Sequence, residues 1–324
     1  MFGGCPPLPE SGHRSEFEDA YPGLELPIIY GEIDDIPKVA VRYDAVVATF
    51  NPSVAWIAPA AKKKPDQIVG YYAQDFEPMF YPPGSEGYQQ AWDSYTLIPN
   101  MVLFAKTEWT RKKIETETNA SCQLVGPSMD VDLFVPRPHS VEWPDRPLRV
   151  GAMIRPASLY RAPKLTMEVL ERISRQYGPR VEILLFGTEK DDPNFAQLSQ
   201  NFPWNLAGIL GPNKVANFLN ELDIFVDFSS HQAMGLTAME AMACGVAVIV
   251  PREGGTSTFS QHEKNCLMVD TSNQNDCLQS LKMLIDDHNL RAKLQKQAIQ
   301  DMPQYFPERA ALKILSCLFN ESLV

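Results

Sequence analysis

The most informative segment of this 324-residue chain is Asp227-Phe-Ser-Ser-His-Gln-Ala-Met-Gly-Leu-Thr-Ala-Met-Glu-Ala-Met-Ala-Cys-Gly-Val-Ala-Val-Ile-Val-Pro-Arg-Glu-Gly-Gly255. An apolar run from Ile224 to Asp227 leads into it and predicts a strand. A loop follows, and strong helix formers from Leu236 to Cys244 predict a helix that stops at Gly245. A second apolar run predicts the next strand, and a Gly-Gly loop comes after it. This order of strand, helix and strand is typical of an α/β fold with a parallel sheet.

The same alternation runs through the second half of the chain. Apolar residues between positions 165 and 177 recur every three to four residues, which predicts a helix that packs one face on the sheet. The predicted strands are Leu148 to Ala152, Val181 to Phe186, Ile224 to Asp227, Ala247 to Val250 and Cys266 to Val269. Three closing helices are predicted at Cys277 to Ile285, Leu290 to Ile299 and Arg309 to Phe319.

The first half shows a shorter series of the same kind. Strands are predicted at residues 45–49, 68–73, 101–105 and 123–125, and helices at 53–61 and 109–116. Four prolines between Val135 and Pro147 exclude a helix or a central strand there and mark a linker. We therefore expect an irregular N-terminal arm at residues 1–43, a first α/β domain at 44–137, a linker at 138–147, a second α/β domain at 148–305, and a C-terminal helix at 306–324 that crosses back to the first domain.

Composition narrows the class of protein. With 44% hydrophobic and 21% charged residues, the chain has the make-up of a folded globular protein. A formal charge of −11 disfavours nucleic acid as a partner, because phosphate backbones require clustered Lys and Arg. The six cysteines form no C-x-x-C pair, and we interpret them as reduced thiols. The first residues lack the basic start and apolar run of a signal peptide, so we expect a cytoplasmic protein.

Several polar groups follow predicted strands, where open parallel sheets place ligand-binding groups. Gln74 and Asp75 end one strand of the first half. Free N–H groups at the helix start after Gly235 suit a diphosphate, and Glu240 on that helix is placed to accept the hydroxyls of a ribose. The alternative is that Glu240 is an ordinary helical carboxylate.

Three basic residues follow the first strand of the second half. Arg155, Arg161 and Lys164 lie within one short segment, and a guanidinium matches phosphate oxygens well. We favour the two arginines, with Lys164 as the alternative to Arg161. The other interpretation is that all three are solvated loop charges.

The segment from Ile224 to Gly255 resembles the donor-binding domain of retaining family 4 glycosyltransferases. This resemblance implies two Rossmann-like domains that face a cleft (the GT-B fold), with the nucleotide sugar bound by the second domain. In that family two glutamates stand eight positions apart; Glu240 matches the second, whereas Gln232 occupies the place of the first. An amide hydrogen-bonds a sugar hydroxyl but carries no charge. The resemblance also implies donor contacts at the two loops and the helix start, namely at Gly235, Leu236, Gly254, Gly255 and Thr256.

Segments of the first half extend the resemblance. Thr107 to Thr110 and Asp130 to Pro136 look like the family's last turn and exit in the first domain, and Ile68 to Tyr81 resembles bacterial polysaccharide rhamnosyltransferases. The family's opening strand, Gly-rich loop and helix have no clear counterpart before Asp44, so we expect a shortened first domain. The implied donor sugar is rhamnose.

The implied reaction is sugar transfer from a nucleotide diphosphate sugar to a glycan or lipid-linked acceptor. We assign catalytic roles to Arg155, Arg161, Gln232 and Asp75, and we expect no metal and no cofactor other than the donor itself. Asp130-Val131-Asp132 matches a metal motif by its letters but falls at the domain exit.

Two other functions stay open, a nucleotide-sugar epimerase and a nucleotide-sugar-binding protein with reduced catalysis. Restoration of activity by Gln232→Glu would indicate a decayed enzyme. The basic runs at residues 62–64 and 111–113 are compatible with weak peripheral contact at the inner face of a membrane, or with a solvated surface.

Overall fold

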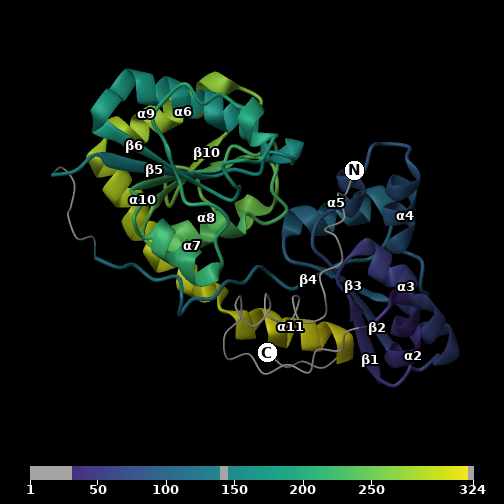
Figure 1. Ribbon diagram of the computed structural model, residues 1–324. Coiled ribbons are helices and arrows are strands. Elements are labelled where there is room, and N and C mark those ends of the chain that lie inside the picture. The colour runs from purple at the N-terminus through teal and green to yellow at the C-terminus, as the bar shows by residue number, and fades with distance from the viewer. Residues whose placement is uncertain (1–30, 139–144, 320–324) are drawn as a thin grey trace.

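The computed structural model describes residues 31–138 and 145–319. The chain forms two α/β lobes, each built on an all-parallel sheet, with the smaller N-terminal lobe beside the larger second one (Figure 1). Two Rossmann-like domains were expected from the sequence, and this fold class is confirmed.

The first sheet has the strand order β1-β2-β3-β4. Its strands are β1 (Ala45–Ala48), β2 (Ile68–Ala73), β3 (Val102–Ala105) and β4 (Gln123–Leu124). The apolar core on one face is formed with side chains of the connecting helices. These helices are α2 (Ile36–Ala40), α3 (Asn51–Lys63), α4 (Glu86–Ser94) and α5 (Glu108–Thr118).

The other face of this sheet is covered from the far end of the chain. Helix α11 (Pro307–Phe319) contacts β2 and β3, and it lies along the smaller lobe in Figure 1. Cys317 and Leu318 form a buried cluster with Phe104 and Val125. Because the C-terminal helix completes the core of the first domain, the two lobes are held together by packing as well as by the linker.

The sequence analysis predicted an irregular arm over residues 1–43, and this prediction is wrong for the last part of the arm. Ile33–Asp35 is a 3-10 turn and α2 follows it at once, with Ala40 buried in the first-domain core. Pro37 in the first turn and the acidic residues just before it favour a helix start. A five-residue helix is too short to show a period in the sequence, which is why the pattern missed it. Residues 1–30 of the expected arm lie outside the described residues.

The second sheet has the strand order β10-β9-β8-β5-β6-β7. Relative to the first strand of this domain, the order reverses between β5 and β8, which gives the Rossmann topology with its switch point at these two strands. The strands are β5 (Leu148–Met153), β6 (Val181–Phe186), β7 (Asn205–Leu206), β8 (Ile224–Val226), β9 (Ala247–Pro251) and β10 (Leu267–Val269).

Helices cover both faces of the second sheet. One apolar core is formed with α6 (Pro163–Tyr177) and α9 (Gln274–Asp286), and it includes the side chains that were expected to face the sheet from the 165–177 helix. The other core is formed with α7 (Pro212–Leu219) and α8 (Leu236–Ala243). Helix α10 (His288–Asp301) contributes one buried residue to each core. Short 3-10 turns complete the chain at Glu77–Phe80, Leu159–Arg161, Gly178–Arg180, Phe195–Gln197, Gly255–Thr258 and Met302–Tyr305.

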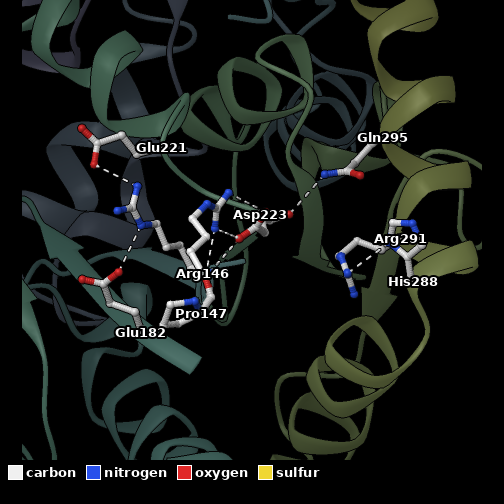
Figure 2. Close-up of polar contacts among 9 residues, drawn as sticks. Arg146, Pro147, Glu182, Glu221, Asp223, His288, Arg291 and Gln295 are labelled. Carbon is white, nitrogen blue, oxygen red and sulfur yellow. Dashed lines mark hydrogen bonds and ion pairs between the residues drawn. The ribbon is translucent and has the colours of Figure 1, made fainter. Parts of the chain in front are cut away.

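A buried ion pair fixes the start of the second domain. Arg146, just before β5, contacts both carboxylate oxygens of Asp223, just before β8, with nitrogen–oxygen distances of 2.6 and 3.0 Å (Figure 2). The two side chains are only 9% and 11% exposed. Asp223 also accepts the backbone N–H of Arg149 at 2.8 Å. These contacts tie the chain entering β5 to the neighbouring strand at the switch point.

A second arginine labelled in Figure 2 hydrogen-bonds the C-terminal end of a helix. Arg291 of α10 is buried and donates to the carbonyl oxygen of Leu284 at 2.6 Å, in the last turn of α9. The last carbonyls of a helix have no partner within the helix. The guanidinium therefore stabilises the end of α9 and orients α10 against it.

Two observations concern the whole described chain. No helix within residues 31–138 and 145–319 combines the length and the apolarity needed to cross a membrane. The five cysteines in this part of the chain are buried free thiols.

Removal of the Asp223 charge should destabilise the second domain. We expect Asp223→Asn to lower the free energy of unfolding by about 3 kcal/mol, because it removes the charge that both terminal nitrogens of the buried Arg146 guanidinium contact. Urea denaturation followed by circular dichroism measures this. The matched control is Glu221→Gln, which alters an ion pair to Arg149 whose carboxylate is 61% exposed, and it should change stability by less than about 0.5 kcal/mol. Equal effects of the two substitutions would contradict a special role for the buried pair.

Candidate active site

A cavity of about 380 Å³ lies between the two domains. The first domain contributes Gln74, Asp75, Phe80 and Lys106 to its lining. The second domain contributes residues that follow β5 and β8 and residues at the start of α8. Most of the lining therefore comes from the carboxyl ends of parallel strands, at the switch point of the second sheet, where this fold class binds its ligands.

Three cations line the cavity. Arg155 follows β5 and donates to the Gly187 carbonyl at 3.2 Å, while Arg161 lies over the ring of Tyr160 at 5.1 Å from its centre. Lys106 follows β3, and burial lowers the pKa of its ammonium. Among the described residues, none of the three forms an ion pair. Their charge is available to an anionic ligand.

The start of α8 opens onto the same cavity. Gly235 has φ of +83°, a conformation that favours glycine, and a Cβ there would come within 2.8 Å of Thr256. Among residues 31–138 and 145–319 no side chain caps this helix, which leaves its first N–H groups available to a ligand. Leu236, the first helical residue, is 44% exposed and lines the cavity. The helix end offers backbone donors and a positive dipole to an anion.

Asp75 brings a buried carboxyl to the wall contributed by the first domain. It is 5% exposed, and burial raises its pKa to about 6, while the Arg161 guanidinium across the cavity opposes the shift. One carboxylate oxygen accepts the backbone N–H of Phe76 at 2.7 Å. Gln74 lies beside it at the end of β2. The midpoint of its titration therefore lies near pH 6, about two units above the ordinary value for Asp.

Gln232 is buried, and its amide is held by two neighbours. Its Nε2 donates to Asp227 Oδ2 at 2.7 Å and to Ser229 Oγ at 3.0 Å. Both protons of the amide nitrogen are therefore used within the loop after β8. The residue lines the cavity, as expected, together with Asp227.

A backbone junction holds this loop in place. The N–H of Gly255 donates to the carbonyl of Gln232 at 2.6 Å, and Gly254 has φ of +113°. A Cβ on either glycine would overlap backbone atoms of residues 232 and 233. From the first domain, Thr107 Oγ1 donates to the carbonyl of Ala233 at 2.7 Å. Three separated chain segments thus meet at one point beside the cavity.

An aromatic stack crosses between the domains next to this junction. The ring of His231 lies between Trp109 and Tyr160, with centre-to-centre distances of 5.6 and 5.4 Å. Trp109 also donates its indole N–H to Glu253 at 2.7 Å. These contacts join α5 of the first domain to two loops of the second.

Some expected site residues lie outside the cavity lining. Lys164 is 83% exposed and pairs with Glu168 at 3.9 Å. Thr256 is buried and donates its hydroxyl to the Pro251 carbonyl at 2.9 Å, while Gly254 and Gly255 serve the loop junction. Donor contacts by these four residues stay a prediction.

Glu240 also lies away from the cavity lining. Burial on α8 raises the pKa of its carboxyl to about 8, so the neutral form predominates at pH 7. A neutral carboxyl has one donor and one acceptor oxygen, whereas the sequence analysis assumed two acceptors. Its contact with a ribose stays a prediction.

The cavity also contains groups that the sequence analysis did not select. Lys106 directly follows the predicted strand at 101–105 and Asp227 is the last residue of the predicted strand at 224–227, the same kind of position that led to Gln74 and Asp75. No sequence pattern indicated Tyr160, because its position beside the cavity depends on ring stacking with His231. Within the described parts of the chain, no group of three or more His, Cys, Asp or Glu side chains is arranged to hold a metal ion.

The second domain is similar to a known protein family. Residues 152–301 match the family model of "Glycosyl transferases group 1". The chain is 25% identical over 251 residues to the O-antigen biosynthesis protein RfbC of Myxococcus xanthus, covering 78% of this chain and 19% of that protein. It is 26% identical over 149 residues to the lipopolysaccharide core biosynthesis glycosyltransferase LpsE of Rhizobium meliloti, covering 44% of this chain and 42% of that protein. The chain thus spans less than half the length of either relative.

The fold of the whole described chain is similar to that of a solved two-domain structure. A crystal structure of HepE from Anabaena in complex with UDP and glucose aligns with a TM-score of 0.74 at 15% identity, covering 90% of this chain and 84% of that one. This similarity concerns the fold, and it confirms the GT-B arrangement of two Rossmann-like domains.

The junction at Gly255 should tolerate no side chain. We expect Gly255→Ala to lower the melting temperature by several degrees, roughly the effect of a 1–3 kcal/mol loss, because the added methyl overlaps the Ala233 carbonyl. Differential scanning calorimetry measures the change. Gly31→Ala is the control, since a Cβ there meets no atom closer than 3.8 Å. Similar melting temperatures for the two variants would contradict the close backbone contact at this junction.

The raised pKa of Glu240 should make stability depend on pH. The folded-state pKa of about 8 lies above the ordinary value of 4.5, so the stabilising contribution of the neutral carboxyl is complete below pH 4.5 and is lost as pH rises through 8. We expect Glu240→Gln to remove part of this decline, making the variant more stable than the wild type at pH 9 by on the order of 2 kcal/mol. Urea denaturation between pH 5 and 9 measures the slope. The exposed Glu308→Gln control should keep the wild-type slope, and an unchanged slope in Glu240→Gln would count against the buried carboxyl.

Proposed function

We propose that this chain is a retaining glycosyltransferase that uses a nucleotide diphosphate sugar, because residues 152–301 match the family model of group 1 glycosyl transferases. The observation that carries this proposal is the interdomain cavity, which places three cations that form no ion pair within the described part of the chain beside the N-terminus of α8. Such a set of donors fits a diphosphate better than it fits a neutral ligand.

The side chains and backbone groups of this chain would act mainly by stabilising the charge that develops on the leaving phosphate. As the bond between the sugar C1 and the phosphate oxygen breaks, its electron pair stays on that oxygen, and Arg155, Arg161 and the α8 N–H groups stabilise the negative charge. The acceptor hydroxyl forms the new bond to C1 from the same face. Its proton passes to the departing phosphate, so no protein nucleophile is needed.

The substrates belong to the proposal as well. RfbC and LpsE bear names of O-antigen and lipopolysaccharide core biosynthesis, which favours a glycan or lipid-linked acceptor for this chain. Rhamnose on dTDP is the candidate donor from the resemblance of Ile68 to Tyr81. UDP-glucose is the second candidate, because the cavity belongs to the same fold as the UDP complex of HepE. Action in the cytoplasm, with weak contact at the inner membrane face, is part of the same proposal.

A nucleotide-sugar-binding protein with reduced catalysis is the second candidate. One observation favours it: position 232 is an amide whose nitrogen is already occupied by Asp227 and Ser229. The two functions share the cavity and differ only in turnover.

The first experiment is a thermal-shift screen of the chain with UDP, GDP, ADP and dTDP and with UDP-glucose, GDP-mannose, ADP-glucose and dTDP-rhamnose. A ligand present at 100 times its Kd should add about 2.7 kcal/mol of stability. Transfer or hydrolysis is then followed by release of the nucleoside diphosphate. Binding without release would favour the binding protein, and no stabilisation by any compound would count against both functions.

The arginines give a sharper test of the anion site. We expect Arg155→Ala and Arg161→Ala each to weaken nucleoside diphosphate binding at least about tenfold, because each removes a charge-assisted donor from the cavity. Calorimetric titration measures the affinities. Lys164→Ala is the control: its side chain is 83% exposed and lies outside the cavity, so affinity should stay within about twofold. A larger loss in Lys164→Ala than in Arg161→Ala would move the phosphate site to α6.

A further inference from the structure

Asp227 is a carboxylate in a cavity that is otherwise suited to anions. It follows β8 directly, at the switch point of the sheet, and it lines the cavity with Arg155 and Arg161. Among the described residues, no Lys, Arg or His side chain forms an ion pair with it. A carboxylate placed beside a diphosphate without a counter-charge would repel it, so Asp227 requires another explanation.

The groups that hold Asp227 are all neutral. Oδ1 accepts the backbone N–H of Ser229 at 3.0 Å and its hydroxyl at 2.5 Å, and Oδ2 accepts the amide of Gln232 at 2.7 Å. These three hydrogen bonds fix the orientation of the Asp227 side chain at the edge of the cavity.

The same contacts explain the amide at position 232. A glutamine donates two hydrogen bonds, and both go to Asp227 and Ser229. A glutamate in the same place would donate none and would bring two carboxylates to hydrogen-bonding distance, where they cannot both stay ionised. Asp227 and Gln232 thus form a matched carboxylate–amide pair, with the charge on residue 227.

We infer that Asp227 is the catalytic carboxylate that contacts the donor sugar, an inference that rests on the proposed glycosyltransferase function. The sugar is neutral and carries hydroxyl donors, unlike the diphosphate beside the arginines. As the C1–oxygen bond breaks and its electron pair moves to the phosphate, positive charge develops at C1, and a fixed carboxylate stabilises it. Asp227 gains and loses no atom, because the acceptor's proton goes to the phosphate oxygen.

The test compares free nucleotide with nucleotide sugar in Asp227→Asn. Calorimetric titrations use UDP against UDP-glucose and dTDP against dTDP-rhamnose. We expect Asp227→Asn to leave the affinity for UDP or dTDP unchanged or tighter, because a repulsive charge is removed. It should weaken binding of the matching nucleotide sugar about tenfold and lower kcat for release of the nucleoside diphosphate about 100-fold.

Exchange of the two side chains supplies the matched control. Gln232→Glu alone should lower kcat, because it sets two carboxylates against each other. Asp227→Asn combined with Gln232→Glu restores one carboxylate and one amide to the pair, and it should recover at least about tenfold of the kcat lost in Asp227→Asn. Circular dichroism and melting curves confirm that all three variants are folded.

Distinct results would overturn the inference and the proposed function. If the wild type binds no nucleotide or nucleotide sugar, the proposed function fails. If the wild type binds and turns over a donor but Asp227→Asn keeps its kcat and its nucleotide-sugar affinity within about threefold, Asp227 is not catalytic. Weaker binding of the free nucleotide in Asp227→Asn, or an increase of kcat in Gln232→Glu alone, would also overturn the assignment.

Discussion

The active cavity depends on one backbone junction, where Gly255 donates to the carbonyl of Gln232 while Thr107 donates to that of Ala233. No residue with a Cβ fits at Gly255, so the loop after β9 can approach the loop after β8 only because of this glycine. The junction sets the position of Gln232 and, through Gly235, the direction in which α8 begins. Since Thr107 comes from the first domain, the same contact also fixes one domain relative to the other.

Charge in the cavity is arranged by the strand topology. The cations follow β5 and β3, whereas Asp227 follows β8, so adjacent strand ends present opposite charges to one ligand. Three cations, Lys106, Arg155 and Arg161, line the cavity together with two carboxyl groups, Asp75 and Asp227. The lining consequently has a net positive character. This suits a molecule with an anionic end and a neutral end, and a nucleotide diphosphate sugar has both.

Much of this could be predicted from the sequence, and the misses have physical causes. The long apolar runs and the 165–177 period predicted the two parallel sheets, but α2 and the two-residue strand β7 are too short to carry a reliable period. In the site, the expectation that ligand-binding groups lie at strand ends led to Gln74, Asp75 and Arg155. The same expectation was not applied to Lys106 and Asp227. Lys164 was selected by its nearness in sequence, although α6 begins at Pro163 and directs the lysine toward Glu168 in the next turn.

Gln232 shows why a family motif cannot be transferred one residue at a time. Considered alone, the amide suggests lost charge and a decayed site. With Asp227 at 2.7 Å, it is the partner that a neighbouring carboxylate requires, because an amide donates where a second carboxylate would repel. The proposed reaction requires a negative charge at a given place in the cavity, and residues 227 and 232, whose side chains are in contact, can each supply it. The identity of residue 232 therefore has meaning only together with that of residue 227.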